Sequence, residues 1–472
     1  MDDGSTRTDG GSATEWHAGT ATAVITPSES MWMAGFGNRD KPSEGVAQDL
    51  HAKVLALEDV EGNRTAIVSA EILFFDRRLR GILERRCEDE HGVEPRRLLL
   101  NASHTHQGPV TRVATDEVED ADGETRLVPR DDGSVNFFTI EFYGVDDVYR
   151  ERVLEYREFL EETVVELVGE AFDALAPAEL SYGHARCGSA MNRRRPNEDG
   201  IGFSPYSDGP VDHDVPVLAV EDPDATGDDA LSAVLFGYAC HPTTLIVYEF
   251  HGDWVGYTQE YLEERFPNAT AIFLQGCGGD QKAYPEKELE YTKAHGRAVA
   301  TAVEAALESV LRPVRGPVRA VYEEATIEFE EPPSREALEA MAESDEAARS
   351  ARGELLLATL DEYGEIPTEY PYPVQALAFG TDLTLVAMAG EVLVGYSLRL
   401  KEELDGPLWT VGYSNNAFTY VPTAQVIYEG GYEGDVVIDM TSLPGKWKTD
   451  LEERIVSTAH TVVDRARTPP RW

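Results

Sequence analysis

Cysteine is scarce in this chain of 472 residues, which contains only Cys87, Cys187, Cys240 and Cys277. The four positions are widely separated, and no two of them form a Cys-x-x-Cys pair. Zinc sites built from cysteine need such close spacing, and disulfide scaffolds need more cysteines in a shorter chain. The sequence therefore argues against both of these classes.

Lysine is also scarce, because only eight of the 41 basic residues are lysines, against 87 acidic residues. The formal net charge is −46, and the acidic residues are spread along the whole length. Such a surface repels phosphate backbones and anionic lipids, which disfavours nucleic acid and membrane surfaces as partners. At molar salt the Debye length shrinks to about 3 Å, so the self-repulsion becomes tolerable. We interpret the composition as halophilic, with an ordinary acidic cytosolic enzyme as the alternative.

Long apolar runs are missing as well. No apolar stretch reaches the roughly 18 residues of a membrane-spanning helix. Residues 1–15 are acidic and polar, and they lack the basic segment and apolar core of a secretory signal. We therefore expect a flexible acidic tail over residues 1–15, no membrane span and a cytoplasmic protein, although export by another route stays open.

Hydrophobic residues make up 42% of the chain, which suits a globular fold with a sizeable core. Short β-branched runs predict strands at 20–25, 53–57, 65–69, 98–102, 217–220, 233–238, 271–274 and 383–387. Longer amphipathic stretches predict helices at about 146–175, 255–266, 287–310, 334–351, 391–404 and 449–466. No Gly/Ser or Pro linker divides the chain. We predict an α/β fold: a single large domain over residues 16–472, with mixed β-sheets flanked by helices.

Two segments interrupt this pattern. Residues 113–134 are acidic and rich in turn formers, which predicts a surface insertion. Residues 330–373 begin with EEPPS and end with GEIPTEYPYP, around a helical stretch. This second segment can form a lid or a flap.

The strongest chemical signal is the run SHTHQGP at residues 103–109, which follows a buried strand. In an extended chain, residues two apart point the same way, so His104 and His106 would share one face. A second apolar strand ends at His241, again followed by proline. Strand-terminal loops are where α/β sheets assemble their sites. Structural histidines are the alternative at this point.

Three further segments carry polar residues that could belong to the same site. Glu391 follows an apolar strand and Gly390, where it can serve as a ligand or cap a helix. Tyr420 precedes Val-Pro-Thr, with Tyr432 close behind, and tyrosine clusters commonly serve packing. Asp280 ends a glycine-rich turn, whose glycines by themselves name no ligand.

Two histidines and a carboxylate form a known hydrolytic metal set. Zinc accepts imidazole nitrogen and carboxylate oxygen, and three protein ligands leave a position for water. The pKa of that water falls to about 7, which makes hydroxide available at neutral pH. An unligated histidine beside the metal, such as His106, can then act as an acid or stabilise the oxyanion.

Taken together, the motifs resemble those of the neutral (non-lysosomal) ceramidase family. The matching blocks follow the family order over roughly residues 18–435: ATAVITP, SHTHQGP, MNRR, CHPTTL, GCGGD, AGE, NNAFTYVPT and GGYEG. The resemblance implies that zinc is held by His104, His241, Glu391 and Tyr420. It also implies that His106, Arg193 and Tyr432 handle substrate polarisation and proton transfer. The implied activity is a zinc-dependent amide hydrolase in which zinc-activated water attacks an N-acyl, lipid-like substrate.

The chain departs from the family in two respects. The family has a serine two residues beyond the aspartate of the glycine-rich turn, and here that position is Lys282. A mechanism that needs this serine is therefore not available. Ceramidases also carry a C-terminal immunoglobulin-like domain, and we expect the catalytic domain to end near the last residue of this sequence. Two alternatives stay open: a binding protein that retains the metal without catalysis, and an esterase or thiol hydrolase that uses Cys277.

Overall fold

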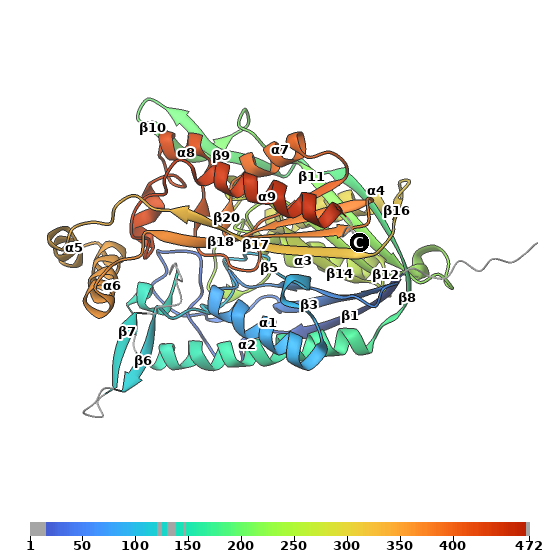
Figure 1. Ribbon diagram of the computed structural model, residues 1–472, viewed down its shortest axis with the longest axis horizontal. Helices are drawn as coiled ribbons and strands as arrows, with labels where there is room; N and C mark the ends of the chain where they lie inside the picture. Colours follow the sequence, from blue (N-terminus) through green and yellow to red (C-terminus); the bar gives the residue numbers. More distant parts are fainter. Residues whose placement is uncertain (1–15, 120–124, 130–137, 145–146, 469–472) are drawn as a thin grey trace, which may run out of the picture.

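A computed structural model describes residues 16–119, 125–129, 138–144 and 147–468 of the protein. The expected tail at 1–15 lies outside the described residues, and the expected insertion at 113–134 is described only in part. Its described part forms a hairpin of β6 (Thr115–Glu119) and β7 (Thr125–Pro129). This hairpin projects from the lower left of the molecule in Figure 1.

A large mixed sheet runs through the molecule in the order β14-β12-β11-β8-β1-β3-β4-β5, with β16 paired to β8. Most neighbours are antiparallel, but β4 and β5 are parallel, as are β12 and β14. The strands are β1 (Trp16–Val24), β3 (His51–Asp59), β4 (Arg64–Ala70), β5 (Leu98–Ala102), β8 (Ala176–Arg186), β11 (Asp214–Glu221), β12 (Leu231–Tyr238), β14 (Thr270–Gln275) and β16 (Arg312–Val314).

A second sheet of four strands has the order β17-β18-β19-β21. These strands are β17 (Val318–Glu328), β18 (Glu369–Phe379), β19 (Leu383–Met388) and β21 (Leu408–Val411). Short strands complete the site region: β9 (Ala190–Asn197) between β10 (Gly200–Tyr206) and β15 (Gln281–Ala283), β20 (Glu391–Val392) beside β22 (Tyr420–Val421), and β2 (Gly45–Val46) beside β13 (Glu249–Phe250).

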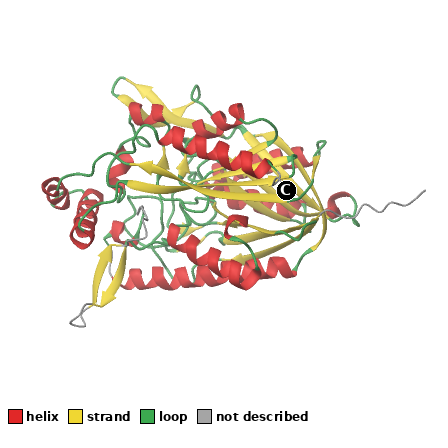
Figure 2. Ribbon diagram, viewed as in Figure 1, coloured by secondary structure: helices red, strands yellow, loops and turns green. Residues whose placement is uncertain are grey.

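The two larger sheets pack face to face, because alternate residues of each strand are apolar on both sides. In β4, Ile67 belongs to the core between the sheets, whereas Ala66 and Val68 belong to the core under the helices. In β19, Leu385 faces the inter-sheet core and Val386 the opposite side. The arrangement is therefore four layers, with helices outside and sheets inside (Figure 2).

Helices cover both outer faces. On the large sheet, α1 (Arg77–His91) and α2 (Asp147–Asp173) pack over the β1–β5 side, and they lie along the lower edge in Figure 1. On the same sheet, α3 (Asp253–Arg265) and α4 (Leu289–Leu307) pack over β11, β12 and β14. The small sheet is covered by α7 (Val394–Glu403) and α9 (Leu451–Arg467). Mixed sheets flanked by helices in one compact domain confirm the expected α/β fold.

All eight expected strands are present, but the expected helix at 334–351 is wrong in its extent. The chain forms α5 (Arg335–Ala342) and α6 (Ala347–Tyr363) instead. Between them the Ser344 hydroxyl accepts a hydrogen bond from the Glu346 N–H at 3.2 Å, which competes with helical pairing. The two helices approach closely at Gly353, where a Cβ would lie 2.4 Å from the Ala342 nitrogen.

The α5–α6 hairpin lies at one end of the molecule, beside β7 and the short helices η2 (Ile140–Tyr143) and η4 (Val436–Met440). None of the residues 330–373 lines the cavity described below, so this segment does not form the lid that the sequence suggested. Among the residues that the structure describes, no helix combines the length and apolar character needed to cross a membrane.

Candidate metal centre

The candidate site forms where strands of both sheets end. His104 follows β5, His241 follows β12 and Glu391 follows β19. Asn101 joins the two sheets at this point, because its side-chain NH₂ donates to the Gly412 carbonyl at 2.9 Å and its amide oxygen accepts from the Gln275 N–H at 2.8 Å. Three segments far apart in the sequence therefore converge.

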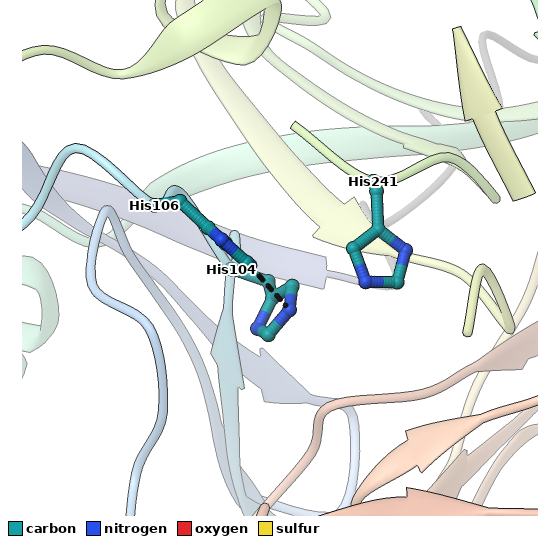
Figure 3. A group of neighbouring side chains, drawn as sticks. All are labelled: His104, His106 and His241. Carbon is teal, nitrogen blue, oxygen red and sulfur yellow. Dashed lines mark hydrogen bonds between the residues drawn. The ribbon is translucent and has the colours of Figure 1, made fainter. Parts of the chain in front are cut away.

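The two histidines of the SHTHQGP run meet by a route that the sequence did not predict. His104 is not extended: its φ is 67°, in the left-handed region, and its N–H donates to the Ile72 carbonyl at 3.1 Å. The chain then turns, so that the Nε2 atoms of His106 and His104 lie 3.1 Å apart. Figure 3 shows this pair with His241 approaching from a separate segment. The side chains share a site as expected, but because of a turn and not of strand alternation.

Glu391 is not at a helix start, which corrects a second expectation. It lies in β20, opposite Tyr420 of β22, and α7 begins only at Val394. The N–H of Val394 instead donates to Asp280 at 2.9 Å, so Asp280 caps this helix. Burial raises the pKa of Asp280 to about 6. The Glu391 carboxylate therefore does not cap α7. Its Oε2 lies 3.2 Å from His104 Nε2 and 3.1 Å from His241 Nε2.

These three side chains direct electron pairs at one another. The Nδ1 atoms of His104 and His241 lie 3.1 and 2.7 Å from the carbonyls of Leu73 and Gly278. A carbonyl only accepts, so each Nδ1 carries the hydrogen, and in a neutral ring the Nε2 then presents a lone pair to the carboxylate. Burial, with a further contribution from Arg193, lowers the pKa of His241 to about 3, which keeps that ring neutral.

Such an arrangement of acceptors fits a metal cation. Ligand atoms at about 2.0–2.1 Å from a tetrahedral zinc lie about 3.3 Å apart, close to the observed separations around Glu391. Imidazole and carboxylate are also a donor set that zinc accepts. Within the described residues, His104, His106 and His241 form a buried group whose nitrogens all lie within 4.8 Å of one another. The residues present therefore fit the expected metal.

Tyr420 approaches the same group through an arginine. Its hydroxyl lies 2.9 Å from Arg193 Nη2 and 3.4 Å from His241 Nε2. Burial raises the pKa of Tyr420 well above its ordinary value, and the Arg193 charge opposes this. Arg193 is held in turn by Glu433 at 2.8 Å and by the Gly279 carbonyl at 2.6 Å. Glu433 was not among the predicted site residues, although it stands beside Tyr432 in the GGYEG motif.

A cavity of about 460 Å³ opens onto this group. Five of the residues singled out from the sequence line it: His106, Arg193, His241, Tyr420 and Tyr432. Lys282 lines it as well. The structure thus brings together all seven candidate residues, while their roles as ligands or catalysts stay predictions.

Cys277 does not belong to this cavity. Its side chain is fully buried in the core of the small sheet, together with Val392 and Tyr396. Burial raises the pKa of the Cys277 thiol above its ordinary value, which disfavours the thiolate that a nucleophile needs. All four cysteines are buried free thiols. The structure gives the thiol-hydrolase alternative no support.

No family model matches the sequence, and no curated protein matches it. Solved structures, in contrast, are similar to this chain over nearly its whole length. The neutral ceramidase from Pseudomonas aeruginosa superimposes with a TM-score of 0.70 at 16% identity, over 97% of this chain and 76% of that chain. A ceramidase complexed with C2 superimposes with a TM-score of 0.71 at 17% identity, over 98% and 77%. This chain therefore has the neutral ceramidase fold.

Proposed function

We propose that this protein is a zinc-dependent hydrolase that cleaves a linear amide bond in an N-acyl substrate. The observation that carries the proposal is the convergence of two imidazole nitrogens on the Glu391 carboxylate, beside the cavity that His241 lines. The ceramidase fold supports an amide as the bond that is cleaved and a lipid-like acyl compound as the substrate class.

His104, His241, Glu391 and Tyr420 would hold the metal. When bound there, zinc supplies a Lewis acid and lowers the pKa of water, which is the chemistry that amide hydrolysis requires. Arg193 would act mainly through Tyr420, because its guanidinium donates to the tyrosine hydroxyl and is fixed by Glu433. This differs from the direct part in substrate polarisation and proton transfer that the family resemblance implies for Arg193.

Two residues of the cavity wall are suited to proton transfer. Burial raises the pKa of Tyr432 to about 12, so its hydroxyl keeps its proton at neutral pH and can donate to an oxyanion or a leaving amine. Burial, followed by the neighbouring His104, lowers the pKa of His106 well below its ordinary value, so its ring is neutral at neutral pH. A neutral imidazole has one N–H and one lone pair, and it can take part in proton transfer through either.

The test is metal analysis of protein purified without added zinc, followed by assays on a panel of N-acyl amides. We expect one zinc per chain, and we expect a chelator to abolish turnover and zinc to restore it. A metal-free chain, or turnover that survives chelation but not iodoacetamide, would contradict the proposal.

A second candidate is a non-catalytic protein that retains the metal, favoured by Lys282 at the position of the family serine. Bound zinc with no turnover on any amide or ester would support it. The cytoplasmic location and the halophilic adaptation stay proposals from the sequence.

A further inference from the structure

The cavity beside the metal centre reverses the charge of the rest of the protein. Its wall contains three basic residues, Arg193, Lys282 and Lys287, and one acidic residue, Glu286. The whole chain has 87 acidic residues against 41 basic ones, and two of its eight lysines are here. Because the surrounding protein is so strongly acidic, a local excess of positive charge in the substrate cavity calls for a specific cause.

Lys282 is built into the site and not onto its rim. It lies in β15, and it forms a parallel bridge with His241, whose N–H donates to the Gln281 carbonyl at 3.0 Å. The side chain of Lys282 therefore begins on the strand that lies beside His241, a candidate metal ligand. The residue is only 7% exposed, and burying an ammonium costs free energy unless an anion compensates it.

The protein provides only one carboxylate, Glu286, to balance the charges of Lys282 and Lys287. Lys282 forms an ion pair with Glu286, whose other carboxylate oxygen lies 3.9 Å from Lys287 Nζ. Two ammonium groups thus share one carboxylate. Arg193 pairs with Glu433, which also pairs with Arg194, and Arg194 has a second carboxylate in Glu429. Two ammonium groups and one carboxylate therefore line this part of the cavity, and the side chain of Lys287 is 67% exposed to solvent.

We propose that the substrate carries an anionic group next to its scissile amide, and that Lys282, assisted by Lys287, binds this group. The inference rests on the proposed amide hydrolysis and specifies its substrate class: N-acyl compounds whose amine portion bears a carboxylate, such as N-acyl amino acids. An ammonium recognises a carboxylate through short, charge-assisted hydrogen bonds. A substrate whose amine portion is uncharged would dehydrate Lys282 without adding a counter-charge to that of Glu286, so the site discriminates against it.

The experiment compares two amides with the same acyl chain, N-lauroylglycine and N-lauroylethanolamide, as substrates of the zinc-loaded protein at one fixed salt concentration. We expect kcat/KM to favour the carboxylate by about tenfold or more in the wild type. Lys282→Met, which keeps length but removes charge, should abolish most of this preference. Glu286→Gln removes the competing carboxylate and should increase the preference. Lys448→Met, an exposed lysine paired with Glu328, is the control and should change neither value.

Anion recognition predicts that the ratio of the two kcat/KM values falls in Lys282→Met and rises in Glu286→Gln, at unchanged zinc content. If Lys282 had only a structural role, its replacement would lower kcat/KM for both substrates by the same factor. Equal kcat/KM for the two amides in the wild type, or a ratio unaffected by Lys282→Met and Glu286→Gln, would overturn the inference while leaving amide hydrolysis intact.

If neither amide is cleaved, the proposed function fails, but the anion site is still testable by titrating the uncleaved pair calorimetrically. Tighter binding of N-lauroylglycine that Lys282→Met removes would support the site. Equal binding of the two compounds would overturn it.

Discussion

Gly35 determines where His106 can lie. A Cβ at this position would lie 2.3 Å from His106 Cγ, and the φ of Gly35 is 94°, which other residues rarely adopt. The absent side chain therefore makes room for the imidazole between Phe36 and His104, whose rings lie 4.8 Å from it on either side. A single glycine thus decides the geometry of a candidate proton acceptor.

Tyr432→Phe tests the role of the cavity hydroxyl. The ring packs at 5.7 Å from the Tyr420 ring, so the variant should fold and retain zinc. Because one oxyanion donor is lost, kcat should fall by about 10²–10³ with little change in KM. Lys282→Ala should act on KM instead, since this ammonium binds substrate. Steady-state kinetics and zinc content check both, and the reverse pattern would mean that the roles are interchanged.

Glu391→Gln tests the metal set. The amide NH₂ would direct hydrogens at two lone pairs, so zinc affinity should fall by more than the roughly 10–100-fold seen when outer partners of a metal site are lost. Metal analysis after dialysis should find far less than one zinc per chain, whereas Tyr432→Phe retains it. Full zinc occupancy in Glu391→Gln would remove Glu391 from the ligand set.

Helix α1 is fixed to α2 by one carboxylate. Asp76 caps α1 by accepting from the Leu79 N–H at 2.7 Å, and it forms a bidentate pair with Arg157 of α2 at 2.7 and 2.9 Å. The segment just before it supplies the Leu73 carbonyl that orients His104. Burial alone would raise the pKa of Asp76, but Arg157 outweighs it, so the pKa is held well below its ordinary value.

Asp76→Asn should lower the free energy of unfolding by about 3–5 kcal/mol, because Arg157 would stay buried with only the longer, 3.4 Å contact to Glu161. Asparagine still caps a helix, so the loss comes mainly from the ion pair. Denaturant unfolding measures it. Glu90→Gln, at the exposed end of the same helix, should leave the midpoint nearly unchanged.

The stabilisation that the Asp76–Arg157 pair contributes depends on pH. In the unfolded chain the aspartate titrates near pH 3.9, and in the folded chain it titrates lower, so its stabilisation is complete above about pH 4 and is lost as the pH falls further. The difference between wild type and Asp76→Asn should therefore shrink below about pH 4. A constant difference at all pH values would contradict the assignment.

At the scale of the whole molecule, charge decides the response to salt. Acidic residues outnumber basic ones by 87 to 41, so repulsion outweighs the surface ion pairs that salt also screens. We expect the Tm and the activity to rise from low to molar KCl, measured by circular dichroism and by amide turnover. A protein that is fully folded and equally active at low ionic strength would contradict the halophilic interpretation.

Eight of the strands could be predicted from the sequence, because the alternation of apolar residues is a local property, whereas β8, β17, β18 and β21 were not predicted. Leu98, Leu99 and Leu100 already indicate a strand buried on both faces, and the ordered motifs indicated the fold. Helix α1 was missed because charged residues dominate it, although its Asp76 and Gly92 caps were readable.

The geometry of the site depends on contacts between distant segments of the chain. His241 and Glu391 are 150 residues apart and meet because strands of two stacked sheets end at the same point. The left-handed turn at His104 and the placement of Glu391 in β20 depend on carbonyls of distant segments, Ile72 and Thr419, which accept the N–H groups of these residues. The positive cavity depends on Lys282 lying beside His241. Such contacts are long-range pairings, and no local pattern of residues encodes them.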